Sequence, residues 1–368
     1  MYFLKKIFPK YSKNNSKKKM EFPNKTKKSL IAIGLINIDV IAEVSKELLI
    51  KYNYDFENNY FKEKNTSYID ELEKNPKVLL APGGSLQNSL RVTKWILNMN
   101  PETKENYKVS LIGLIGDEER KKIILNELNE LEINHIFEIK KNSKCSRCGV
   151  GIYNNERHLQ GENNTCVSEE FIEKNLSKIL EHDIIIFESF MIGRSYNIYK
   201  KLINEFNKKN SLIGIALGAN FIISNFYDKI IDICNNCHFI FSNLQEIESL
   251  AKEKNDNIYK TIESAHKKLS EKNRLIITTC GKNPVIVSKY DYKRNKMDFI
   301  LESFPNLIED KNIVDTNGAG DSFLAGFIAG FMKGDSIEKS CKIGNIVAEN
   351  IIKHMGCTFD KNEIIDFE

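Results

Sequence analysis

The sequence predicts an α/β fold, with a mostly parallel central sheet between two layers of helices and a small lid of β-strands. Short apolar segments of strand length alternate with segments of helical periodicity, a pattern typical of parallel sheets covered on both faces. The chain has 368 residues, of which 41% are hydrophobic, enough for a large core with a smaller lid. Two polar stretches break the alternation, at about residues 40–79 and 141–167, and we expect the lid there.

The strands and helices can be assigned in chain order from the apolar pattern. A buried strand is expected over residues 30–40, interrupted by a glycine, and Gly83 and Gly84 open a helix that extends past Trp95. Ligands of parallel sheets bind at the carboxyl ends of the strands, and the polar residues discussed below follow such ends. The other expected elements are strands at 109–115, 183–187, 211–217, 239–241 and 275–279, and helices at 118–131, from Ser168 onward, and at 196–208.

The formal net charge of +4 conceals a basic segment at the N-terminus. Residues 1–30 contain ten lysines and one glutamate, so the rest of the chain sums to about −5. A segment rich in Lys, Asn and Ser has too little apolar surface to fold. We therefore expect residues 1–28 to be a disordered, solvated extension; contact with nucleic acid or an anionic surface, or a targeting role, are the alternatives. The folded domain is expected over 29–368, with a core of about 29–39, 80–140 and 168–368.

The composition also limits location and partners. No apolar run is long enough to span a bilayer, and the short apolar start is interrupted too early by lysines for a secretory signal. We expect a cytoplasmic monomer with small-molecule partners and no nucleic acid, with nuclear targeting by the tail as the alternative location. The eight cysteines are then expected to be reduced thiols. The pairs Cys145/Cys148 and Cys234/Cys237 lie too far apart to resemble a compact zinc module, so zinc is disfavoured.

The most informative segment is the glycine-rich turn at residues 315–323, which follows an apolar strand end and opens an apolar helix. Gly318 and Gly320 allow close approach of the backbone to a ligand, and a helix start offers unpaired N–H groups and the positive end of the dipole. This combination suits phosphate oxygens. Asp321 adds a carboxylate in the first turn, where it could take a proton from an attacking hydroxyl; helix capping is the simpler alternative.

Further features are compatible with phosphoryl transfer, although each has a structural alternative. Asp39 lies near a strand end and could equally be a turn residue. Arg157, in the expected lid, could stabilise charge on a transferred phosphoryl group or be a solvated charge. Asn243 and Glu246 have the spacing of a capping box and could also hold magnesium, directly or through water. Close backbone approach and amide groups at a second helix start are expected from Gly83, Gly84, Gln87 and Asn88.

On these motifs the chain resembles the ribokinase-like (PfkB) carbohydrate kinase family, and within it is similar to the adenosine kinases. The resemblance covers roughly residues 29–360 and rests most specifically on the 315–323 turn. Residues 83–89 with Trp95, and the ending at 356–359, favour adenosine over sugars as the acceptor. Residues 220–227 and 241–246 also match.

The resemblance implies an αβα sandwich with a lid, and ATP with Mg²⁺ as the phosphate donor for the 5′-hydroxyl of adenosine. It implies Asp321 as the base, the N–H groups of Gly318, Ala319 and Gly320 as the anion hole, and Arg157 as the lid arginine. Substrate-binding positions would be Asp39, Asn37, Gly83, Gly84, Asn88, Leu159 and Phe190. Nucleotide-binding positions would be Asn243, Glu246, Thr278, Gly281 and Asn317, with Asn243 and Glu246 also near magnesium, through water.

The chain departs from the adenosine kinase pattern on the side that would bind the base. Leu35 stands where these kinases have Asn, with Asn37 on the same strand face as a substitute, and the lid after Arg157 is more polar than usual. Phe190 is the expected stacking ring. We therefore expect phosphoryl transfer with an altered base site. The alternatives are a sugar or other nucleoside kinase of the family, or a nucleoside-binding protein that has lost activity.

Overall fold

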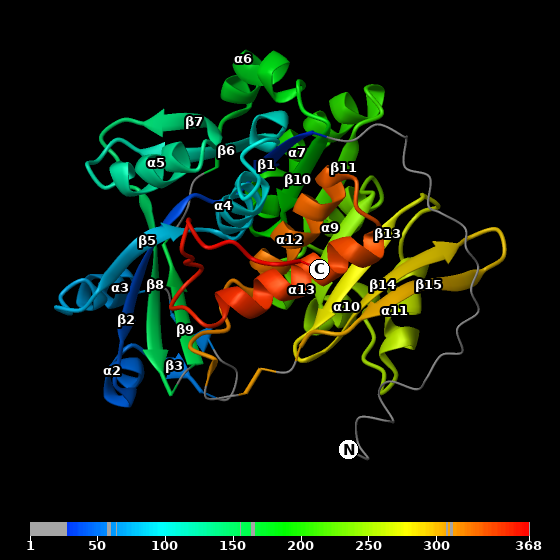
Figure 1. Ribbon diagram of the computed structural model, residues 1–368. Helices are drawn as coiled ribbons and strands as arrows, with labels where there is room; N and C mark the ends of the chain where they lie inside the picture. Colours follow the sequence, from blue (N-terminus) through cyan, green and yellow to red (C-terminus); the bar gives the residue numbers. More distant parts are fainter. Residues whose placement is uncertain are drawn as a thin grey trace.

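The computed structural model describes residues 28–56, 60–63, 65–154, 156–162, 166–306, 308–309 and 312–367, so all but the last residue of the expected basic extension lies outside it. The core is a nine-stranded sheet in the order β15-β14-β13-β12-β11-β10-β1-β6-β7 (Figure 1). Neighbours from β13 to β7 pair in parallel, and β14 and β15 add antiparallel strands at one edge, which confirms the predicted mostly parallel sheet. The strands are β1 (Ser29–Ile33), β6 (Lys108–Gly116), β7 (Asn134–Lys140), β10 (Ile184–Glu188), β11 (Leu212–Ala216), β12 (Phe239–Asn243), β13 (Leu275–Cys280), β14 (Asn283–Asp291) and β15 (Lys296–Ser303).

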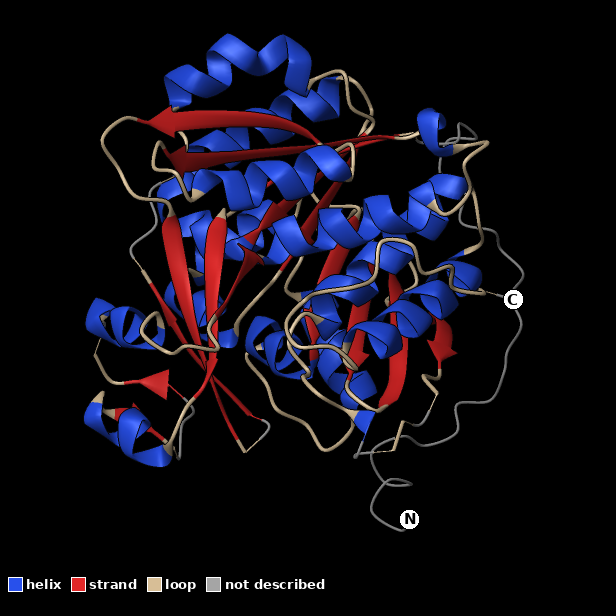
Figure 2. Ribbon diagram, turned by 60° about the vertical axis from the view of Figure 1, so that its left-hand side comes forward, coloured by secondary structure: helices blue, strands red, loops and turns tan. Residues whose placement is uncertain are grey.

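Helices cover both faces of this sheet, as the sequence predicts (Figure 2). Each face has its own apolar cluster, because strands such as β10 are buried on both sides. One face carries α4 (Ser85–Asn98), α5 (Lys121–Glu130), α12 (Ala319–Lys333) and α13 (Ile337–Ile351). The other carries α6 (Glu169–Ile179), α7 (Ile192–Lys208), α8 (Asn220–Asn225), α9 (Tyr227–Cys234), α10 (Leu244–Ala251) and α11 (Ile258–Lys267). Short 3₁₀ turns occur at Lys104–Asn106 and Ser189–Met191.

Helix α12 is apolar on all sides because it packs against both α4 and α13. A Cβ placed on Gly326 of α12 would lie 2.7 Å from the Cα of Gly344 in α13, so only glycine allows this close contact. The packing fixes the start of α12, and with it Asp321, against the start of α4. None of the helices in the described part of the chain combines the length and the apolar character needed to cross a bilayer.

A four-stranded sheet in the order β5-β2-β8-β9 forms the lid beside the core, and α2 and α3 lie on its outer side (Figure 1). The single strand expected at 30–40 is in fact two, since the chain leaves the core sheet after β1 and starts β2 at Asn37. The expected boundaries near residues 40 and 80 therefore cut through lid strands, and Asn37, Asp39 and Gly83 all belong to the lid sheet. The lid elements are β2 (Asn37–Glu43), β5 (Leu79–Gly83), β8 (Ser146–Tyr153), β9 (Glu156–Gly161), α2 (Lys46–Lys51), α3 (Thr66–Leu72), and the pair β3 (Tyr54–Asp55) and β4 (Tyr60–Phe61).

Candidate active site

The glycine-rich turn has the geometry of an anion-binding helix start. Gly318 is the N-cap residue of α12 and has φ 75°, a left-handed conformation that favours glycine. The Ala319 N–H donates to the carbonyl of Thr316 at 3.3 Å, whereas the N–H groups of Gly318 and Gly320 have no acceptor among the described residues. A Cβ on Gly320 would meet nothing within 4 Å, so the turn is open on that side. The turn therefore offers two backbone N–H groups without an acceptor among the described residues at the positive end of a helix, one on buried Gly318 and one on exposed Gly320.

Asp321 lies in the first turn of α12 and is held by two side chains of α4. The Ser85 hydroxyl donates to Oδ1 at 2.6 Å, and the Asn88 amide donates to Oδ2 at 3.3 Å. Desolvation raises the pKa of Asp321 above its usual value, and the Ser85 and Asn88 bonds together with Arg157 oppose that rise. The side chain is half-buried, so it is not turned into the core. A positioned carboxylate with a raised pKa can accept a proton from a neighbouring alcohol.

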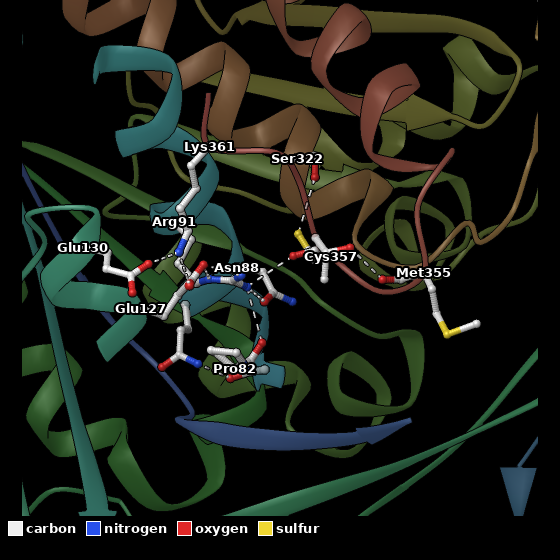
Figure 3. Close-up of polar contacts among 12 residues, drawn as sticks. Pro82, Asn88, Arg91, Glu127, Glu130, Ser322, Met355, Cys357 and Lys361 are labelled. Carbon is white, nitrogen blue, oxygen red and sulfur yellow. Dashed lines mark hydrogen bonds and ion pairs between the residues drawn. The ribbon is translucent and has the colours of Figure 1, made fainter. Parts of the chain in front are cut away.

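Asn88 is oriented by a buried arginine one turn further along α4 (Figure 3). Arg91 donates through Nη1 to the Asn88 Oδ1 and to the carbonyl oxygen of Cys357, both at 3.2 Å. The other side of its guanidinium is paired with Glu127 at 2.9 Å. Because Arg91 requires an acceptor, the amide oxygen of Asn88 must face it, which turns the amide nitrogen toward Asp321.

Asp39, on lid strand β2, is the second carboxylate of the site, and its charge interacts with that of Asp321. Burial raises the pKa of Asp39 to about 7, with Arg157 and Arg91 lowering it and Asp321 raising it. A Cβ on Gly83 would lie 2.0 Å from the Asp39 Oδ1, so the carboxylate rests directly on the glycine backbone. A donor-rich ligand such as a diol could satisfy this desolvated carboxylate.

Gly84 gives a second close approach at the join between lid and core. It has φ 106°, and a Cβ there would lie 2.3 Å from the carbonyl oxygen of Leu35. Asn37 is buried in β2, opposite Gly83 in the register. The structure thus brings Asn37, Asp39, Gly83 and Gly84 together at one place, next to the start of α4.

Arg157 reaches the glycine-rich turn from lid strand β9. Its guanidinium forms an ion pair with Asp315, the first residue of the turn, and its side chain is 9% exposed. Asp315 also accepts from the N–H groups of Gly356 at 2.7 Å and Asn317 at 2.9 Å, so it is already well satisfied. Burial lowers the pKa of Arg157 to about 10, which leaves it cationic at neutral pH. Its Nε and Nη1 have no hydrogen-bond partner in the described part of the chain.

Asn243 and Glu246 form a complete capping box at the start of α10. The Asn243 Oδ1 accepts from the Glu246 N–H at 2.9 Å, and the Glu246 carboxylate accepts from the Asn243 N–H at 2.9 Å. Asn243 and Glu246 therefore cap α10, which was the structural alternative to a role in magnesium binding. Burial raises the pKa of Glu246 to about 7, and the charge of Asp321 contributes. The described residues contain no group of three or more His, Cys, Asp and Glu side chains able to hold a metal ion, and all eight cysteines are free.

The remaining positions expected at the nucleotide divide into two groups. Gly281 has φ 59° and open space on its Cβ side, and Asn317 lies within the glycine-rich turn. Thr278 is different, since it is 0% exposed and its hydroxyl is hydrogen-bonded to Ser242 at 3.1 Å. The structure does not bring the Thr278 side chain to the site.

The residues expected at the base are exposed apolar side chains. Phe190 is 36% exposed and packs on Gly218, where a Cβ would lie 2.6 Å from the ring. Its ring centroid is 6.5 Å from that of Phe221, which is also exposed. Leu159 of β9 is 50% exposed. Exposed apolar side chains of this size could contact an apolar ligand group, and the aromatic pair suits a planar one.

Sequence reasoning missed three residues that the structure places at the site: Ser85, Arg91 and Glu188. Ser85 and Arg91 lie on the predicted helix, but their contacts with Asp321 and Asn88 depend on how helices pack. Glu188 could have been found, because a carboxylate that directly follows an apolar strand lies where ligands of parallel sheets bind.

Comparison with known proteins supports the same reading. Adenosine kinase 2 of Arabidopsis thaliana is 25% identical over 342 residues, covering 90% of this chain and 95% of that protein. Adenosine kinase of Schizosaccharomyces pombe is 25% identical over 299 residues, covering 77% and 83%. The structure of Anopheles gambiae adenosine kinase in complex with P1,P4-di(adenosine-5) tetraphosphate matches with a TM-score of 0.77, at 24% identity, over 89% of this chain and 96% of that one.

The fold and the reaction class follow from these matches. Adenosine kinase from Schistosoma mansoni in complex with 2-fluoroadenosine has a TM-score of 0.76 at 22% identity, over 90% of this chain and 97% of that one, which confirms the predicted ribokinase-like fold. The model of the pfkB family carbohydrate kinases matches residues 27–364, nearly the whole described chain. The protein is accordingly a phosphotransferase with an alcohol acceptor. The match to the family model over residues 27–364 shows that the chain belongs to the pfkB family of carbohydrate kinases.

Proposed function

We propose that this chain transfers the γ-phosphoryl group of ATP to the 5′-hydroxyl of adenosine, giving AMP for purine salvage. The observation that carries the proposal is the placement of Asp321, held by Ser85 and Asn88 close to the N–H groups of Gly318 and Gly320, for which the described residues offer no acceptor. Adenosine as the acceptor is supported by relatives named adenosine kinase that align with 90% of the chain.

In this mechanism Asp321 orients the attacking hydroxyl and accepts its proton. The transition state of phosphoryl transfer is loose, so the proton can leave late and the base need not be strong. Desolvation raises the pKa of Asp321, which makes its carboxylate a better acceptor than an exposed aspartate. Ser85 and Asn88 each occupy one oxygen and leave further lone pairs for the substrate.

Negative charge on the transferred phosphoryl group is stabilised by backbone N–H groups of the glycine-rich turn and by Arg157. The N–H groups of Gly318 and Gly320 form the anion hole. Arg157 supplies charged donors from the lid through Nε and Nη1, which have no partner in the part of the chain that the structure describes. Lid residue Asp39 and core residue Asn88 bind ribose hydroxyls, and Phe190 with Leu159 contacts the base. Adenosine thereby bridges lid and core.

Magnesium fits on the nucleotide side of this site. Burial is the main cause that raises the pKa of Glu246, and the negative charge of Asp321 adds to it, so a divalent cation beside Glu246 would offset the repulsion between the two carboxylates. Asn243 and Glu246 would hold the ion through water, since their direct contacts complete the capping box. Bound Mg²⁺ neutralises phosphate charge in such reactions.

A substrate panel tests the proposal directly. The purified full-length chain is assayed with ATP and Mg²⁺ against adenosine, other nucleosides, ribose and fructose. We expect the highest kcat/KM for adenosine. A sugar or another nucleoside as the preferred acceptor contradicts the assignment within the family. Thermal stabilisation by adenosine without turnover supports a nucleoside-binding protein instead.

The pKa of Asp39 predicts a pH dependence of substrate binding. Because burial raises that pKa to about 7, the carboxylate becomes neutral as the pH falls through 7 and stops accepting two hydroxyls. Arg157, Arg91 and Asp321 are the charged groups that face it. We expect KM for adenosine to rise below pH 7, and Asp39→Asn to raise KM about 10- to 100-fold with little further dependence on pH, from loss of hydrogen bonds to a charged group.

Steady-state kinetics between pH 5.5 and about 8.5 check this prediction. Asp291→Asn is the matched control, because Asp291 lies at the β14–β15 turn and its carboxylate has only local partners, the backbone N–H groups of Lys293 and Arg294 and the exposed Arg294 side chain. A pH profile of KM that is the same for Asp39→Asn and the wild type would remove Asp39 from the substrate site.

A further inference from the structure

Glu188 is a buried carboxylate that contacts the join between core and lid. It ends β10 and is 1% exposed, next to the point where the chain leaves β1 for the lid. The N–H of Leu35, in that connection, donates to Glu188 Oε1 at 2.5 Å. The N–H of Leu86, in the first turn of α4, faces Oε2 at 3.5 Å. Glu188 therefore links β10, to which it belongs, with two other segments: the β1–β2 connection and the start of α4.

Two glycines, Gly34 and Gly84, make room for the Glu188 carboxyl group and leave it a capping position. A Cβ on Gly34 would lie 2.8 Å from Glu188 Oε2, so a side chain at residue 34 would displace it. Helix α4 begins at Gly84, which has no side chain with which to cap it. The Glu188 carboxyl group therefore takes the place of an N-cap side chain, supplied from a neighbouring strand.

The contact of Glu188 with the start of α4 matters because α4 carries two residues that hold Asp321. Ser85 and Asn88, in the first turns of α4, hold the two oxygens of Asp321. A small rotation of the helix start would move both donors, and misplacement by about 1 Å can cost about 100-fold in rate. We propose that Glu188 is a positioning residue for phosphoryl transfer, which ties the core-to-lid connection to α4 and so fixes Ser85 and Asn88 against Asp321. The proposal rests on the function proposed above.

The electrostatics agree with this role. Burial is the main cause that raises the pKa of Glu188 to about 8, the charge of Asp321 adds to it, and the two backbone N–H bonds oppose it. Tyr199 also faces the residue, since its hydroxyl donates to the backbone carbonyl of Glu188. Burying a carboxyl group is unfavourable compared with an apolar side chain of similar size, so its contribution lies in what it holds in place.

The test is Glu188→Gln, which keeps the shape but turns one acceptor into a donor that faces a backbone N–H. We expect kcat to fall about 10- to 100-fold with a much smaller change in KM. Hydrogen exchange at the Leu35 and Leu86 amides should become faster. The matched control is Glu138→Gln, because Glu138 likewise braces a helix start, accepting from the Ser168 N–H at 2.6 Å, on a helix without site residues. That control should keep the wild-type kcat.

Two further variants show whether Glu188 acts through α4. Ser85→Ala combined with Glu188→Gln should be little slower than the slower single variant, because both disturb the same contact with Asp321. Gly34→Ala, whose methyl group would crowd Glu188 Oε2 and the Cβ of Leu86, should give the same split between kcat and KM. Wild-type kcat in Glu188→Gln, or fully additive losses in the double variant, overturns the proposal.

The proposed function and the positioning role of Glu188 are tested by different measurements. Amide exchange at Leu35 and Leu86 is measured without substrate, and kcat is measured with whichever alcohol the wild type phosphorylates best. If that alcohol is not adenosine, the proposed function fails while the role of Glu188 is still decided. Unchanged exchange at both amides in Glu188→Gln contradicts the positioning role whatever the substrate.

Discussion

Replacing Asp321 with Asn is expected to lower kcat about 10²- to 10⁴-fold while the protein stays folded. The amide cannot accept the hydroxyl proton, yet it has nearly the same shape and can still bond to Ser85. Desolvation raises the pKa of Asp321, so the ionised form is favoured less in the folded than in the unfolded chain. The stability linked to this group is present at low pH and is lost as the pH rises through the raised pKa. At neutral pH the Asn variant should therefore melt at the same temperature as the wild type or higher.

Steady-state kinetics and thermal melting separate this catalytic role from a capping role. If Asp321 served only to cap α12, its replacement would lower the melting temperature and leave the rate per folded molecule unchanged. Asp335→Asn is the matched control, since Asp335 follows the other end of α12 and its ion pair with Lys339 lies on the surface. Near-normal turnover in Asp321→Asn would remove the base from the mechanism.

The layers of the fold were predictable because the signals for them are local. Apolar runs such as residues 184–187 mark strands buried on both faces, and the positions of Ser168 and of Gly83–Gly84 mark helix starts. The one strand expected over residues 30–40 was the error. Gly34 lies within an apolar run, and no local feature shows that the residues after it pair with β5 and β8 instead of the core sheet.

The site was predictable as a set of residues but not as a set of contacts. Gly318, Gly320 and Asp321 act within one turn, so their spacing could be interpreted from the sequence alone. The contacts of Asp321 with α4, and of Arg157 with the turn, join segments far apart in the chain. Thr278 shows the opposite case: a residue at the right strand end whose side chain points into the interior because of the alternation along β13.

Arg157→Ala is expected to lower kcat about 10²- to 10³-fold with a small effect on KM for the acceptor. Arg157 is held at the turn by Asp315, and its Nε and Nη1 have no partner among the described residues, so its charge is available to a phosphoryl group. Arg147, on the adjacent lid strand β8, offers the contrast. Its guanidinium is paired with Asp70 at 2.8 Å, Glu73 at 3.0 Å and Glu162 at 2.5 Å, so its charge is already neutralised.

The two lid arginines should therefore behave in opposite ways. Arg147→Ala leaves three carboxylates without their shared partner and should lower the melting temperature more than the rate per folded molecule. Arg157→Ala removes a poorly partnered buried cation, while Asp315 keeps its two backbone donors, and should cost rate with little loss of stability. Single-turnover rates and melting curves of both variants test this contrast. Arg157→Ala with unchanged single-turnover kinetics would place the phosphoryl group out of reach of the lid.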